Sequence, residues 1–111
     1  MEVFRHMVYE YQKGLRDLSL FTCLGELLEK IEKTLRLQKI DYLIYPLPGG
    51  KINLFFGCSE CLKIVEGFSS SDLSVITPEE DFILGMMLGY AKPQQYQRFL
   101  TRKNLPALSV C

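Results

Sequence analysis

A proline and two glycines separate two apolar runs in the middle of the chain, and this pattern constrains the fold most. Pro48-Gly49-Gly50 suits a tight turn, because proline presets one backbone dihedral and glycine permits a positive φ. The runs 41–47 and 51–57 are therefore predicted to pair as an antiparallel hairpin. Residues 42–45 are apolar throughout, which predicts a strand covered on both faces. The second strand is predicted to alternate, with Ile52, Leu54 and Phe56 on one face and Lys51, Asn53 and Phe55 on the other.

Helical patterns lie on both sides of this hairpin. Residues 24–39 carry one apolar stripe and acid–base pairs at i,i+4 spacing, which predict an amphipathic helix with a solvated face. Ser59 is predicted to cap a short helix over 60–66 that Gly67 ends. Thr77-Pro78-Glu79-Glu80 has the form of a capping box and predicts a helix to about Tyr90. A last amphipathic helix is predicted to open at Pro93.

The first residues fit two patterns. Apolar residues between 3 and 18 follow a helical period, and some of them also follow a strand period. We favour a helix that ends near Gly14, followed by a short buried strand over 18–22. The chain is then a single α+β domain over 1–104, with the order α-β-α-β-β-α-α-α and a loose tail over 105–111. We expect a three-stranded mixed sheet that contains the antiparallel hairpin.

Charge and hydropathy exclude several classes of protein. Net charge is zero, which gives no overall attraction to nucleic acid or to an anionic membrane. The longest apolar stretch, 82–91, is too short to cross a bilayer, which needs about 20 residues. The sequence opens without a basic region followed by an apolar stretch, so we expect a cytoplasmic protein with reduced cysteines.

Cys58-Ser59-Glu60-Cys61 lies between a predicted strand and a predicted helix, where a dithiol redox site belongs. A helix N-terminus favours the thiolate, and Glu60 between the two cysteines opposes it. The alternative is that Cys61 is a small core residue and Cys58 a loop residue. The chain has one histidine, His6, and lacks a second CxxC, so we expect no metal site. No phosphate-binding loop or catalytic motif occurs, and we expect no cofactor.

The C-terminal third is a candidate partner-binding surface. Residues 1–81 carry nine basic and thirteen acidic residues, a net charge of −4, and residues 82–111 carry four basic residues and no acid. Residues 82–90 are apolar nearly all round, and two glycines four apart would leave a groove. The candidate residues are Gly85, Met86, Gly89, Lys92, Arg98 and Arg102. The alternative is that 82–90 is the central core helix and that the basic residues form a solvated face.

Three motifs stand out: 9–16 (YEYQKGLR), 53–57 (NLFFG), and 79–85 (EEDFILG) with its continuation through Leu88-Gly89-Tyr90 to Gln94-Gln95 and Arg98. Together they resemble a small bacterial family catalogued as domain of unknown function number twenty twenty-three. Members tend to have Asp where this chain has Cys58, and many have Cys where it has Tyr96. The resemblance implies no activity. It implies an association with flavodoxin, because members are often encoded beside one.

These observations favour a non-enzymatic binding or regulatory module. Its expected partner is a protein, with flavodoxin as the candidate that the resemblance implies, or a second copy of the chain. The alternatives are a thiol-dependent redox protein that uses Cys58 and Cys61, and a small-ligand sensor.

Overall fold

The computed structural model describes residues 1–105, and over these residues helices alternate with strands in the predicted order. The elements are α1 (Glu2–Gln12), β1 (Leu18–Leu24), η1 (Gly25–Leu27), α2 (Leu28–Leu37), β2 (Asp41–Pro46), η2 (Pro48–Gly50), β3 (Lys51–Gly57), α3 (Ser59–Glu66), α4 (Pro78–Met87) and α5 (Lys92–Arg102). The two η elements are single turns of 3-10 helix. The α+β class is confirmed, and the ambiguous first segment is a helix.

The three strands form one sheet in the order β1-β3-β2. Both strand pairs are antiparallel, with Leu18 and Asp41 each opposite Gly57, so the sheet is antiparallel throughout and not mixed as expected. The physical reason is the place of β3. The hairpin turn folds β3 back into the centre, where it separates β1 from β2, and the two strands that run in the same direction never become neighbours. The predicted turn is confirmed, with Gly49 at φ 80° and Gly50 at φ 75°.

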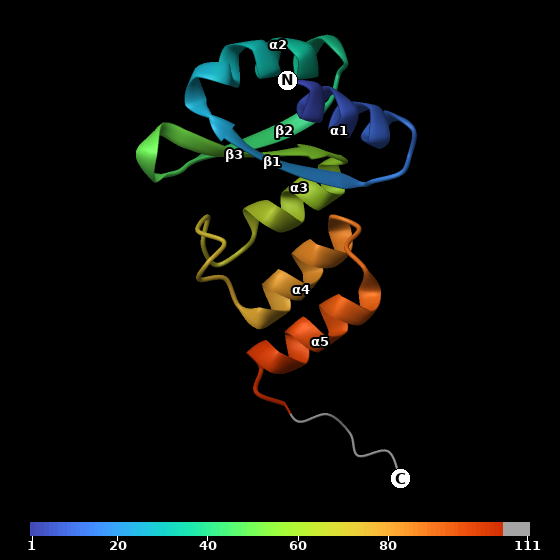
Figure 1. The fold of residues 1–111 in the computed structure, drawn as a ribbon, viewed down its shortest axis with the longest axis vertical. Helices are drawn as coiled ribbons and strands as arrows, with labels where there is room; N and C mark the ends of the chain where they lie inside the picture. The colour runs from blue at the N-terminus through green and yellow to red at the C-terminus, as the bar shows by residue number, and fades with distance from the viewer. Residues whose placement is uncertain (106–111) are drawn as a thin grey trace.

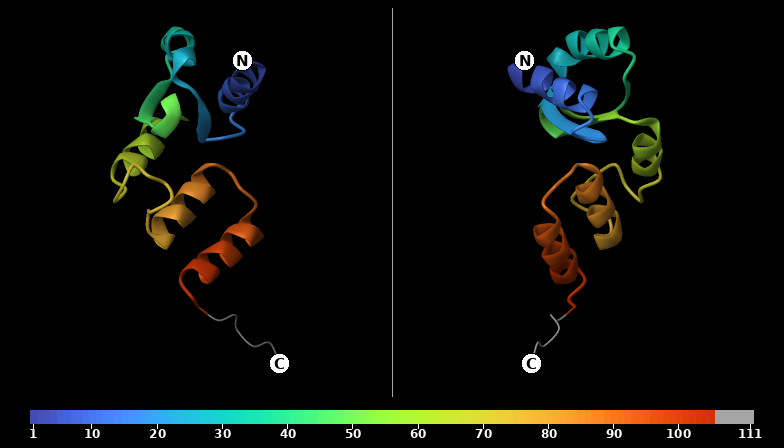
Figure 2. Two further views of the ribbon diagram at one scale, coloured as in Figure 1. Left: turned by 60° about the vertical axis from the view of Figure 1, so that its left-hand side comes forward. Right: turned by 90° about the vertical axis from the view of Figure 1, so that its right-hand side faces the viewer.

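Two cores lie on opposite faces of this sheet, and β3 contributes to both. Ile52, Leu54 and Phe56 pack with α1 and α2, whereas Phe55 faces the other way and packs with α3 and α4. The alternation predicted for β3 is therefore confirmed. Figure 1 shows α1 and α2 above the sheet and α3 and α4 below it, and both views of Figure 2 place α5 farther from the sheet than α4.

Several element ends differ from the predicted ones. The helix predicted over 24–39 begins later, because β1 continues through Leu24 and η1 makes the turn before α2. Cys58, not Ser59, is the residue at which α3 is capped, and no side chain accepts a hydrogen bond there. Ser59 is already helical, so its hydroxyl lies one residue too late to cap the helix.

The capping box at the start of α4 is confirmed. The Thr77 hydroxyl accepts a hydrogen bond from the Glu80 N–H at 3.1 Å, and the Glu80 carboxylate accepts one from the Thr77 N–H at 2.9 Å. The far end of α4 is shorter than predicted, since the helix stops at Met87 and not near Tyr90. The reason is Gly89, whose φ of 79° is left-handed and cannot continue a right-handed helix.

Of the predicted tail over 105–111, only Leu105 lies within the described residues, and its N–H donates to the Leu100 carbonyl at 2.9 Å. In the part of the chain that the structure describes, no helix combines the length and the apolar character that crossing a membrane requires.

Candidate functional site

The edge strand β2 presents unpaired backbone groups along the rim of the sheet. The Leu47 N–H donates to the Lys51 carbonyl at 2.8 Å, and this fixes which residues of β2 bond to β3. Bonded and non-bonded residues alternate in an antiparallel pair, so Tyr42 and Ile44 direct their N–H and C=O groups away from β3. Pro46 follows with an outward carbonyl and no N–H. Within residues 1–105, no other strand lies beyond β2.

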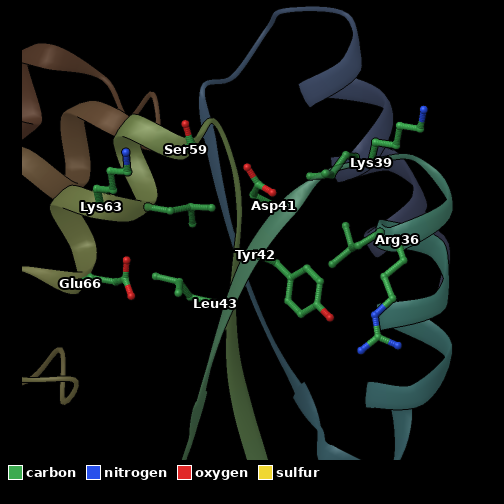
Figure 3. A pocket seen from close by; sticks show the side chains of 11 residues that line it. Arg36, Lys39, Asp41, Tyr42, Leu43, Ser59, Lys63 and Glu66 are labelled. Atoms are coloured by element: carbon green, nitrogen blue, oxygen red, sulfur yellow. The ribbon is translucent and has the colours of Figure 1, made fainter.

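A groove of about 570 Å³ runs along this rim. Figure 3 shows β2 between two helical walls, with Arg36 and Lys39 at the α2 side and Ser59, Lys63 and Glu66 on α3. The side chains of β2 alternate between the walls, since Tyr42 points toward α2 and Leu43 toward α3. The groove therefore combines an apolar floor, a row of free amides and carbonyls, and a charged rim.

The α2 wall is held in place by one carboxylate. Glu32 accepts a hydrogen bond from the Tyr42 hydroxyl at 2.6 Å, and its Oε2 also lies 3.2 Å from Arg36 Nη2. The Glu32 hydrogen bond, with some burial, raises the pKa of the Tyr42 phenol. Tyr42 is thus a neutral donor at neutral pH, and it fastens the outermost strand to α2.

The α3 wall carries two exposed charged side chains. Lys63 and Glu66 lie three residues apart on α3, and both side chains are exposed. Among the described residues, neither of them forms an ion pair. An unpaired cation and an unpaired anion beside a free strand edge are available to a second molecule.

The two candidate redox cysteines lie at the groove end of α3. Cys58 is half-buried at the helix N-terminus, and Cys61 is buried in the core formed with α4. Both are free thiols. Burial first, and the neighbouring Cys58 second, raise the pKa of the Cys61 thiol well above its usual value. The structure thus places Cys61 as the core residue of the alternative interpretation, and its raised pKa disfavours the nucleophilic thiolate near neutral pH.

The two glycines of 82–90 do not line a common groove, since Gly85 borders a cleft that Gly89 does not reach. A Cβ on Gly85 would lie 2.0 Å from the Gln95 side-chain oxygen, so α5 fills the space beside it. Gly89 lies outside α4, where its Cβ would lie 2.8 Å from Arg16 Nη1. Sequence reasoning placed both glycines in one helix, and the structure gives them separate neighbours.

Most of the basic residues of the C-terminal third are paired within the molecule. Arg98 donates to both oxygens of Asp81, at 2.6 and 3.0 Å, and Arg102 lies 3.2 Å from the same carboxylate. Lys103 lies 2.7 Å from Glu79. Lys92 is exposed at the start of α5, and Met86 is half-buried on α4. The ion pairs to Asp81 and Glu79 hold α5 against α4. Contacts of Phe82 with Tyr96 and Phe99 join the same two helices.

His6 lies on α1, with an exposed ring 3.7 Å from Glu10. Over residues 1–105 no cluster of three or more histidine, cysteine, aspartate or glutamate side chains is placed to hold a metal ion. The groove at β2 is the site that sequence reasoning missed. Two local signals were present: the unbroken apolar run 42–45, which indicates burial on both faces, and Pro46, which is typical of an edge strand.

Comparison with known proteins supports the resemblance that the three motifs suggested. The model of a protein family matches residues 2–102, nearly the whole chain, and its description is protein of unknown function (DUF2023). No curated protein matches the chain.

Proposed function

This chain belongs to the family described as protein of unknown function (DUF2023), and we propose that it is a non-enzymatic protein-binding module. The observation that carries the proposal is the free edge of β2, where Tyr42 and Ile44 direct N–H and C=O groups away from β3 and where Tyr42 lines the groove. An extended segment can add to such an edge as a further strand, with main-chain hydrogen bonds giving affinity and side-chain pockets giving specificity.

The exposed edge also argues for a partner on general grounds. Proteins protect free edges with charges, bulges, short strands or covering segments, because an open edge recruits other strands. The centre of β2 is apolar at Tyr42, Leu43, Ile44 and Tyr45, and the protecting residues, Asp41 and Pro46, lie only at its two ends. The opposite edge is less open, since Leu20 of β1 borders the same clefts as Leu88 and Tyr90. A binding function gives the open edge of β2 a use.

Flavodoxin is the first external partner to test, because the resemblance implies this association. Flavodoxins are generally acidic, and the groove rim carries the cations Arg36, Lys39 and Lys63 beside the acids Asp41 and Glu66. An open-sheet protein also has strand edges of its own.

The test is a titration of the chain with purified flavodoxin, followed through the amide signals of Tyr42 and Ile44. Binding at the groove should shift both signals and slow the hydrogen exchange of both amides. Ile44→Pro removes the N–H at the centre of the edge, and Ile44→Ala is the matched control that removes the side chain but keeps the N–H. We expect Ile44→Pro to weaken binding at least about tenfold more than Ile44→Ala. Equal affinity in both variants would show that the strand edge is not the binding surface.

A thiol-dependent redox role is the second candidate, and the position of Cys58 favours it. Cys58 is half-buried at a helix N-terminus, and Cys61 lies in the following turn. A reversible Cys58–Cys61 disulfide with a potential near that of the cytosolic glutathione pool would support this role over the binding module. The absence of this disulfide under glutathione redox buffers would exclude the redox role.

A further inference from the structure

Resting on the proposed function, we infer that the edge of β2 binds a second copy of this chain, and that two sheets join there into one antiparallel six-stranded sheet. The strand pattern permits a two-fold axis through Leu43. In that arrangement Tyr42 of one copy lies opposite Ile44 of the other, and the two residues exchange both of their free N–H···O bonds. A two-fold pairing uses the same outward groups on both copies, so the N–H and C=O groups of Tyr42 and Ile44 all find a partner.

The charges on α3 are self-complementary about the same axis. Lys63 and Glu66 lie on the groove wall beside β2 and have no ion-pair partner in the described part of the chain. A two-fold axis that passes between them brings Lys63 of each copy toward Glu66 of the other. One surface thus supplies both halves of two ion pairs, which a partner of uniformly acidic or basic charge would not match.

The basic residues at the α2 wall do not oppose this arrangement. Arg36 is already paired with Glu32 at 3.2 Å. Lys39 precedes β2 at its Asp41 end. Antiparallel pairing places the Asp41 ends of the two copies at opposite ends of the interface, so the two Lys39 side chains are kept apart. The two Lys39 charges therefore do not meet across the axis.

The experiment uses the full chain and measures its mass by sedimentation over a range of concentrations. We expect a concentration-dependent dimer in the wild type. Lys63→Glu places an acid opposite Glu66 of the other copy and should raise the dimer dissociation constant about tenfold. Glu66→Lys should have the same effect, because it places a cation opposite Lys63. The matched control is Lys30→Glu, an equal charge change at an exposed position of α2 that does not line the groove.

Two rescues distinguish a second copy from any other occupant. The swapped variant Lys63→Glu/Glu66→Lys should recover the wild-type dissociation constant, because each copy again offers one cation and one anion. A mixture of the two single variants should form a mixed dimer, because one copy then carries two acids and the other two bases. Both results need the same chain on both sides of the interface.

Hydrogen exchange tests the strand pairing itself. The Tyr42 and Ile44 amides should exchange more slowly as the protein concentration rises, whereas an exposed amide such as that of Thr22 should not respond. A wild type that stays monomeric at millimolar concentration, or a swapped variant that does not recover association, would overturn the inference. If such a monomer still binds flavodoxin at the edge, as Ile44→Pro would reveal, the proposed function stands and only the second copy is excluded.

Discussion

Arg16 donates a hydrogen bond from Nη1 to the carbonyl of Leu88 over 2.6 Å, and this bond joins two parts of the chain that lie 72 positions apart. Leu88 is the C-cap residue of α4, so Arg16 satisfies a backbone carbonyl that the helix leaves free. A cation also interacts favourably with the negative end of the helix dipole. Both residues belong to motifs that carried the resemblance to the family.

Gly89→Ala should destabilise the protein more than Gly14→Ala. Both glycines have a left-handed φ, 79° and 76°, at which an added Cβ costs about 1–2 kcal/mol. Gly14 has open space around it, whereas a Cβ on Gly89 would lie 2.8 Å from Arg16 Nη1. Urea denaturation of both variants gives the comparison. In an Arg16→Met background, Gly89→Ala should cost no more stability than Gly14→Ala. If the difference between the two glycine variants stays unchanged, the contact with Arg16 does not matter.

Gly85→Ala should destabilise the attachment of α5. The new Cβ would lie 2.0 Å from Gln95 Oε1, and Gln95 is only 7% exposed, so the side chain has little room to move. Overpacking of this kind costs about 1–3 kcal/mol. The double variant Gly85→Ala/Gln95→Ala should recover part of the loss, as measured by chemical denaturation. No recovery would mean that backbone atoms of α5, and not Gln95, resist the methyl group.

Asp81→Asn should lower stability at neutral pH and matter less in acid. The hydrogen bond from Arg98 holds the pKa of the Asp81 carboxyl below its usual value. A carboxyl with a depressed folded pKa stabilises fully above its unfolded value of about 3.9, and this contribution is lost as the pH falls through the folded pKa. We expect a loss of about 1–2 kcal/mol at pH 7.

Denaturation curves at pH 7 and below pH 4 test this prediction. The difference between wild type and Asp81→Asn should shrink in acid, while Glu26→Gln, at an exposed acid of η1, should change little at either pH. A difference that is constant with pH would contradict the ionic role of Asp81.

Alkylation should distinguish the two helix-start cysteines. Iodoacetamide at pH 7.5 should modify Cys58 in the native protein and spare Cys61, because burial raises the pKa of the Cys61 thiol and shields its sulfur. Cys61→Ser should destabilise by roughly 1 kcal/mol, since a hydroxyl replaces a buried thiol, and Cys58→Ser should have little effect. Peptide mass mapping gives the sites, and modification of Cys61 at the rate of Cys58 would contradict the burial argument.

The sequence alone determined features whose energies are local. The Pro48-Gly49-Gly50 turn, the capping box between Thr77 and Glu80, and the alternation of β3 all depend on residues close together in the chain. Each follows from backbone geometry or a short hydrogen bond. The sequence could therefore predict the element order and the two faces of β3.

Only the tertiary structure decided how these elements meet. The basic residues of α5 read as a free surface because their partners, Asp81 and Glu79, lie in another helix. The place of β3 between β1 and β2 left the edge of β2 open, and Pro46 is the one local sign that β2 is an edge strand. Contacts between residues far apart in the chain have energies that depend on the whole fold. The candidate site is built from such contacts, so it emerged only when α2, β2 and α3 were assembled.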